Sequence, residues 1–396
     1  MKILFVTELW PPHGGSFVLD QVKSVVPFVS TTVAVLIPQP PDLSRYRHIR
    51  SRFAGKSGGP EILYDIPVYY LRYRTLPELG RYLNSMQAAR VLKRFLQRHH
   101  ASFDLIHAHF AYTSGFAAVH SARRKKIPAI ITVHGSDINY YTRRNPRNLI
   151  AAGYTVWGLR HAAAIHAVSQ DLKNKVTDLG VAADRIAVIH NGIQETMFFP
   201  RGDKAALRRQ LQLPENDMFF LYTGNFSRVK GLDVLLNAFA QVQGKLSNAK
   251  LIMIGGGELE TDLKQSAQIA GLEKKIIWVG KKPHNEIPDW MNAADFLVLP
   301  SLSEGFGLVL LEALACGTPV IASAVGGVPE ILTAPELGIM VPPGDGEKLA
   351  DAMLAAAGKS WDPKKLTAYA HANTWSERAP RFLQVYQTAL GNKQRD

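Results

Sequence analysis

Short apolar runs alternate with amphipathic or polar segments along the whole chain. Each run is too short for a helix and is bounded by turn residues, which is typical of a buried strand. In the first half these runs lie at residues 3–6, 33–37, 68–71, 104–110, 129–133, 164–168 and 186–189. After a looser segment at 191–213 they return at residues 218–222, 251–254, 276–279, 296–299, 319–322 and 339–341. This alternation predicts doubly wound α/β architecture with parallel sheets.

The looser segment divides the pattern into two similar halves, and 396 residues are enough for two domains. We therefore predict two Rossmann-like domains, residues 1–195 and 196–375, followed by a helical segment at 376–396. Ligands of open α/β sheets bind at the carboxyl ends of the strands. The two domains are therefore expected to face each other across a cleft that holds the ligand.

Residues 300–323, PSLSEGFGLVLLEALACGTPVIAS, contain the most informative polar pattern. A loop with Glu304 leads into a predicted helix at 308–315 that contains Glu312. Eight helical residues advance about 12 Å, so these carboxylates are too far apart to act as an acid and base pair on one bond. The free N–H groups at the helix start suit a phosphate. The pattern predicts a site for a sugar, a diphosphate and a ribose, and the alternative is an ordinary loop with two solvated glutamates.

The stretch EGFGLVLLEALACGTPVIAS resembles the E-x7-E signature of the family-4 retaining glycosyltransferases, which have the GT-B fold. The resemblance covers essentially the whole chain and implies transfer of a sugar from a nucleotide donor, most simply a UDP-sugar, with retention of configuration. It implies no cofactor and no metal, and a last helix that crosses back to the first domain. Glu304 would bind sugar hydroxyls and Glu312 the ribose diol. The implied site residues are His134, Arg228, Lys230 and Glu304 for catalysis; Gly14, Gly15, Asn225, Lys281, Lys282, Gly305, Phe306, Gly307, Leu308 and Glu312 for the donor; and His109 and Asp137 on the acceptor side.

The loop at 223–231 departs from the family pattern. Asn225 stands where the family has an arginine, so Arg228 is the candidate substitute, while Lys230 matches the family position. Two cations in a loop that leads into a helix suit a departing diphosphate. The alternative is ordinary surface charge at a loop.

The segments HAHF and TVHGSD both end predicted strands. Strand alternation puts His107 and His109 on one side of their strand. Together with His134 and Asp137 they could supply the three or four ligands of a zinc site, which is the alternative to hydrogen-bonded histidines. The family resemblance implies instead that His134 contacts the transferred sugar near its reacting carbon.

The net charge of +13 lies entirely in the first half, where residues 1–195 hold 25 Lys and Arg against 12 Asp and Glu. Basic residues interleave with aromatic ones at 45–59, and further clusters lie at 81–98 and 123–126. We predict docking of the first domain on an anionic membrane surface that carries a lipid-linked or polysaccharide acceptor. No apolar run is long enough to span a membrane, and the single cysteine, Cys316, fits a reducing compartment. A cytoplasmic protein, peripheral on the inner face of the plasma membrane, is expected, with no nucleic-acid partner.

Two other classes of function remain as alternatives. An NAD-type Rossmann oxidoreductase would need G-x-G-x-x-G after the first strand, where the chain has WPPHGGS. A non-catalytic membrane- or RNA-binding protein could keep a nucleotide-sugar pocket. The HAHF and TVHGSD segments and the basic first half most resemble bacterial cell-surface polysaccharide transferases of the teichuronic acid type. Because no nucleophile is evident, front-face substitution is preferred to a covalent intermediate.

Overall fold

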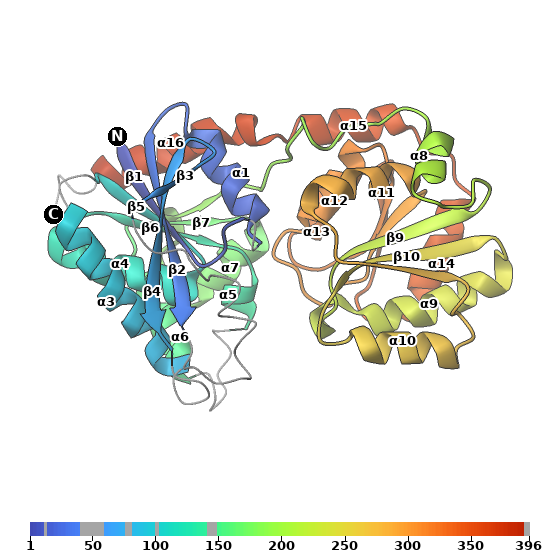
Figure 1. Ribbon diagram of the computed structural model, residues 1–396, viewed down its shortest axis with the longest axis horizontal. Helices are drawn as coiled ribbons and strands as arrows, with labels where there is room; N and C mark the ends of the chain where they lie inside the picture. Colours follow the sequence, from blue (N-terminus) through green and yellow to red (C-terminus); the bar gives the residue numbers. More distant parts are fainter. Residues whose placement is uncertain (12–13, 40–58, 76–80, 100–102, 141–148, 392–396) are drawn as a thin grey trace. The chain divides into compact units, whose positions relative to one another are not determined.

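The computed structural model describes residues 1–11, 14–39, 59–75, 81–99, 103–140 and 149–391 (Figure 1). The chain forms two compact units. Unit 1 comprises Met1–Asn191 and Arg378–Asp396, and unit 2 comprises Gly192–Glu377. The predicted basic segment at 45–59 lies, except for Gly59, outside the described residues.

Unit 1 contains, within its described part, an eight-stranded sheet in the order β3-β4-β2-β1-β5-β6-β7-β8. All neighbouring strands are parallel except β3, which is antiparallel to β4. The strands are β1 (Lys2–Thr7), β2 (Ser30–Gln39), β3 (Glu61–Leu63), β4 (Ile66–Arg74), β5 (Leu105–His109), β6 (Ala129–Val133), β7 (Ala164–Ala167) and β8 (Ile186–Val188). Every strand predicted for this half is confirmed, and β3 is an addition.

The helices of unit 1 connect these strands in the α/β manner (Figure 1). They are α1 (Ser16–Val25), α3 (Arg81–His99), α4 (Phe116–Ala122), α5 (Ser136–Asn139), α6 (Leu149–His161) and α7 (Gln170–Asp178), with short turns η3 (Ala111–Gly115), η4 (Arg123–Lys125) and η5 (Ala183–Arg185). The last helix, α16 (Trp375–Gly391), begins in unit 2 and belongs to unit 1 from Arg378 onward. Its Phe382 and Tyr386 are fully buried.

Unit 2 contains a six-stranded parallel sheet in the order β11-β10-β9-β12-β13-β14. The strands are β9 (Met218–Asn225), β10 (Ala249–Gly256), β11 (Ile276–Gly280), β12 (Phe296–Leu299), β13 (Val320–Ser323) and β14 (Gly338–Val341). The helices and turns are α8 (Lys204–Gln210), η6 (Arg228–Lys230), α9 (Leu232–Lys245), α10 (Glu260–Ile269), η7 (His284–Glu286), α11 (Ile287–Ala293), α12 (Leu308–Ala315), α13 (Val328–Ile331), α14 (Gly346–Ala357) and α15 (Pro363–His371). The predicted doubly wound architecture is confirmed in both units.

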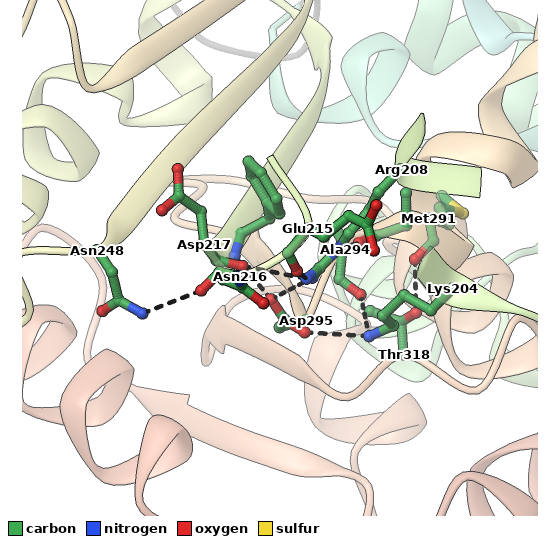
Figure 2. A network of polar contacts seen from close by, with 12 residues as sticks. Lys204, Arg208, Glu215, Asn216, Asp217, Asn248, Met291, Ala294, Asp295 and Thr318 are labelled. Atoms are coloured by element: carbon green, nitrogen blue, oxygen red, sulfur yellow. Dashed lines mark hydrogen bonds and ion pairs between the residues drawn. The ribbon is translucent and has the colours of Figure 1, made fainter. Parts of the chain in front are cut away.

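Polar contacts at the amino end of the unit 2 sheet fix two central strands against each other (Figure 2). Asp295, directly before β12, accepts hydrogen bonds from Phe219 N on β9 (2.7 Å) and from Arg208 on α8 (2.7 Å). The buried Arg208 also donates to the carbonyl oxygens of Ala293 and Glu215. Because strands are rigid, this bracing also sets the relative position of the loops at the opposite ends of β9 and β12.

Each sheet has one point where the strand order reverses. In unit 1 it lies between β1 and β5, and in unit 2 it lies between β9 and β12. In doubly wound sheets the loops that follow such a pair of strands form a crevice where ligands bind. The loops that follow these four strands are therefore where functional side chains are expected.

Candidate functional site

The loops after β9 and β12 in unit 2 are joined through their backbones. Leu302 N donates to the carbonyl oxygen of Val229 (2.8 Å). Gly231, at the start of α9, has φ +60°, and a Cβ there would overlap the carbonyl oxygen of Pro300. Glycine is required because a side chain would both strain the backbone and separate the two loops.

The carboxylate of Glu304 is held by both of these loops. Its Oε1 accepts from Lys230 Nζ (2.5 Å) and from Ser301 Oγ (2.8 Å). The side chains of Lys230 and Glu304 are 23% and 11% exposed, so the pair is reached by solvent on one side. Gly326, in the loop after β13, packs on the Glu304 backbone, where a Cβ would overlap the Glu304 carbonyl oxygen. Three loops thus fix the position of one predicted catalytic carboxylate beside one predicted catalytic cation.

Helix α12 begins beside this pair. Gly307 is its N-cap, with φ +91°, and no side chain caps the first turn. Gly305, Phe306 and Gly307 are buried, while Leu308 is half-buried. The first N–H groups of a helix without a capping side chain attract anions.

The remaining predicted donor residues lie at the same edge of the sheet. Glu312 is buried on α12, and its Oε1 lies 3.1 Å from His284 Nε2. Lys281 and Lys282 follow β11 and are exposed, and Lys282 pairs with Glu286 (3.1 Å). Asn225, the last residue of β9, and Arg228 in the loop that follows are also exposed. The strand ends place all of these residues on one edge of unit 2, and their contact with a donor stays a prediction.

The loop after β1 carries the predicted glycines of unit 1. Gly14 and Gly15 have φ +103° and +80°. A Cβ at Gly15 would lie 2.7 Å from the carbonyl oxygen of Leu9, whereas one at Gly14 would meet nothing within 4 Å. Gly15 therefore closes the loop on itself, whereas Gly14 leaves space that the described residues do not fill.

The sequence analysis missed Glu8, which lies at the end of β1. It accepts a hydrogen bond from the Tyr73 hydroxyl of β4 (3.0 Å). Burial raises its pKa to about 7, although hydrogen bonds from Tyr73 and Thr113 oppose the shift. The position of Glu8 in the sequence could have indicated a functional role. A carboxylate directly after the first strand of a doubly wound sheet lies next to the point where the strand order reverses.

Asp137 braces the two loops that follow β5 and β6. Its Oδ2 accepts from Ala111 N (2.9 Å), and its Oδ1 accepts from the N–H groups of His134 (3.1 Å) and Gly135 (2.9 Å). Burial raises its pKa, and these N–H groups oppose the shift. The side chain is 2% exposed. Any effect on an acceptor would therefore act through the loops it holds, and the predicted acceptor role stays a prediction.

A chain of hydrogen bonds runs through the core of unit 1. His166 Nε2 is 2.6 Å from the carbonyl oxygen of Ile189, so it carries the proton and leaves Nδ1 to accept from the Thr132 hydroxyl (2.9 Å). The Thr132 oxygen then accepts from His107 Nε2 (2.7 Å), and His107 Nδ1 accepts from the Tyr386 hydroxyl (2.9 Å). This order requires both histidines to be neutral. Burial lowers the pKa of His166 to about 4 and that of His107 well below its usual value.

His109 and His134 form a separate pair, with His109 Nδ1 3.1 Å from His134 Nε2. Both have a pKa well below the usual value, first because burial removes water and then through repulsion by neighbouring histidines. The zinc alternative finds no support, because the part of the chain that the structure describes holds no group of three or more His, Cys, Asp or Glu arranged for a metal. His107 also uses both ring nitrogens for hydrogen bonds.

Two doubly wound α/β units, each with polar loops where its strand order reverses, are the architecture of the GT-B fold. The fold is shared with sucrose-phosphate synthase from Thermosynechococcus elongatus, with a TM-score of 0.81 and 22% identity over 99% of this chain and 100% of that one. It is also shared with Anabaena HepE in complex with UDP, with a TM-score of 0.74 and 22% identity over 98% and 100% of the two chains.

Residues 32–196 match the family model described as Glycosyltransferase Family 4, and residues 203–372 match that of the group 1 glycosyl transferases. The Bacillus subtilis protein TuaC, whose name assigns it to teichuronic acid biosynthesis, is 31% identical over 95% of this chain and 90% of its own. D-inositol 3-phosphate glycosyltransferase 1 from Catenulispora acidiphila is 32% identical over 76% of this chain and 77% of its own. The chain belongs to this family of glycosyltransferases, which removes the oxidoreductase alternative. No helix in the described ranges is long and apolar enough to cross a membrane.

Proposed function

We propose that the protein transfers a sugar from a nucleotide-diphosphate sugar, with UDP as the first candidate nucleotide, to a hydroxyl of a lipid-linked or polysaccharide acceptor. The observation that carries the proposal is the Lys230–Glu304 pair beside the uncapped start of α12. A cation and free helix N–H groups suit a diphosphate, and the adjacent carboxylate suits sugar hydroxyls. HepE structures with UDP and UDP-glucose and the assignment of TuaC to teichuronic acid biosynthesis support this choice of donor and product class.

The proposed reaction retains the anomeric configuration and uses no metal ion. The acceptor oxygen attacks the anomeric carbon on the face that the diphosphate leaves. The new carbon–oxygen bond forms as the bond to the phosphate oxygen breaks, and the hydroxyl proton passes to that phosphate oxygen. Lys230 and the first N–H groups of α12 stabilise the charge that develops on the diphosphate. Glu304 orients the sugar, and His134 of unit 1 acts as a hydrogen-bonding group toward it.

A thermal-shift screen with UDP, GDP and ADP sugars tests the donor. We expect the UDP-sugars to raise the melting temperature in a concentration-dependent way, because ligands that bind only the folded state stabilise it. Transfer followed by NMR of the product should show the donor's anomeric configuration and should continue in EDTA. An inverted product would contradict the mechanism, and no stabilisation by any nucleotide sugar would favour the non-catalytic alternative.

We also propose that unit 1 docks on an anionic membrane surface. Helix α3 carries exposed Arg90, Arg94 and Arg98, and the residues of η4, Arg123–Lys125, are not buried. Each basic residue near an anionic surface contributes about 1 kcal/mol. The buried face of α3, which includes Leu92 and Leu96, belongs to the core.

Sedimentation with phosphatidylglycerol vesicles at low salt tests this docking. Replacing Arg90, Arg94 and Arg98 by Ala should weaken binding by roughly a hundredfold, since three such contacts are lost. The same number of charges removed from unit 2, at Lys359, Lys364 and Lys365, is the control and should leave binding unchanged. Equal sedimentation with neutral and anionic vesicles would contradict the proposal.

A further inference from the structure

The ring of His109 is completely enclosed at the end of β5. The residue is 0% exposed, and its ring stacks with those of His107, His134 and Phe5, at centroid distances of 5.1, 5.3 and 6.1 Å. Its Nδ1 contacts His134 Nε2, while its own Nε2 is buried without a hydrogen-bond partner in the described part of the chain. His109 therefore has one polar contact, and that contact is to a residue with a proposed role in transfer.

The unpartnered Nε2 atom decides which histidine donates. Both rings are neutral, so in the hydrogen bond between His109 Nδ1 and His134 Nε2 one of the two nitrogens carries the proton and the other accepts it. If His134 donated, His109 would carry its proton on Nε2, as a buried N–H without an acceptor. In protein backbones, buried N–H groups without partners are rarer than under-satisfied carbonyl oxygens, and we apply the same preference to these ring nitrogens. The arrangement of lower free energy therefore has the His109 proton on Nδ1, which donates it to His134 Nε2. The Nε2 atom of His109 then keeps a lone pair without a hydrogen-bond donor.

We infer that His109 is a positioning residue that fixes His134 as its Nδ1–H tautomer. His134 is half-buried. The rings of Phe17 and Phe110 pack against its ring, with centroid-to-centroid distances of 4.9 and 4.7 Å. None of its contacts within the described residues uses Nδ1. His134 therefore offers a hydrogen-bond donor to a ligand oxygen and is not a base. This inference rests on the proposed function for the role of His134, but its tautomer is a separate property.

The inference also bears on the path of the acceptor proton. A neutral His134 that already carries its proton on Nδ1 and accepts from His109 at Nε2 has no free lone pair for a hydroxyl proton. This is consistent with the proposed front-face reaction, in which the departing phosphate oxygen accepts the proton. The N–H of His134 suits a sugar or phosphate oxygen that gains negative charge as the bond breaks.

Long-range 1H–15N NMR of the full-length protein with labelled histidine rings tests the tautomer directly. The His134 signals are identified by their loss in His134→Asn. In the wild type we expect the proton of His134 on Nδ1. In His109→Phe, which keeps a ring but removes the donor, we expect the proton to move to Nε2 in part or fully. Tyr386→Phe, which alters the other hydrogen-bond chain through His107, is the matched control and should leave the His134 signals in place.

Kinetics supply the second readout. His109→Phe should lower kcat about tenfold, the effect of one hydrogen bond, with little change in the KM for the donor. His109→Asn, whose side-chain N–H can replace Nδ1–H, should restore most of the loss. A His134 proton on Nε2 in the wild type overturns the inference even if neither His109 variant folds. The expected tautomer combined with unchanged transfer in His134→Asn would leave the inference standing and contradict the proposed role of His134.

Discussion

Unit 1 is expected to lose stability when the pH falls from 7 to 5. His107, His109, His134 and His166 are neutral in the folded state because burial lowers their pKa values, whereas a histidine in the unfolded chain has a pKa near 6.5. Below pH 6.5 the unfolded state therefore binds more protons, so stability falls as the pH falls. For His166, whose pKa is lowered to about 4, the loss at pH 5 is about 2 kcal/mol, and the other three histidines act in the same direction.

Two carboxyl groups act in the opposite direction. Glu8, with its pKa raised to about 7, binds a proton in the folded state before it would in the unfolded state, and Asp137 is shifted in the same sense. Glu8 alone offsets about 2 kcal/mol at pH 5, as much as His166 contributes, so the net loss of stability comes from the other three histidines.

Urea unfolding at pH 5, 6 and 7, with hydrogen exchange followed separately for β5–β7 and β9–β12, measures this loss. Protection of β5–β7 should collapse first. His166→Gln can keep the contacts to Thr132 and Ile189 but cannot take up a proton, so it should reduce proton uptake on unfolding by one. Equal stability of unit 1 at pH 5 and 7 would show that the buried histidines do not control it.

Replacing Lys230 by Ala is expected to lower kcat/KM for transfer by about 10²–10³-fold, the usual effect of removing one group that stabilises developing charge. Lys348→Ala, which removes an exposed lysine on α14, is the control and should leave the rate unchanged. A loss smaller than tenfold in Lys230→Ala would contradict the assignment.

Glu304→Gln is expected to have opposite effects on binding of the nucleotide diphosphate and on transfer of the sugar. Lys230 is paired with Glu304, and a diphosphate that binds Lys230 must compete with this carboxylate. Removing the negative charge should therefore strengthen binding of UDP alone by a few-fold, because a partly exposed ion pair contributes about 1 kcal/mol or less. Transfer should nevertheless fall, because the sugar loses its carboxylate. Calorimetry with UDP and transfer assays on the same preparation give the two values.

The sequence predicted the elements around Glu304 well because local signals agreed there. The apolar run of β12 and the helix α12 were predicted with the bounds that the structure shows, 296–299 and 308–315. Gly317 and Pro319 end the helix, and this local effect does not depend on contacts with residues far away in the sequence. Strand β3 was missed because its turn to β4 uses Tyr64 and Asp65 with φ +55° and +61°, where glycine would have been the signal.

Contacts between distant residues could not be predicted in the same way. Lys230 was assigned to a phosphate, and nothing in the local pattern shows that it pairs with Glu304, 74 residues away. His107 and Tyr386 are separated by 279 residues. The histidines of HAHF and TVHGSD were recognised as strand-end residues, but which of them is enclosed and which is half-buried depends on side chains from α1, β1 and α16.

The return of α16 to unit 1 determines when that unit can be completed during translation. Phe382 and Tyr386 fill the core beside His166 and His107, and Arg381 donates to the carbonyl oxygen of Val188. These residues leave the ribosome after the whole of unit 2, although the strands of unit 1 leave it before unit 2. Unit 2 is continuous in the chain, whereas the core of unit 1 lacks Phe382 and Tyr386 until α16 has been synthesised. Chaperone demand in the cell should therefore fall on the oldest part of the nascent chain.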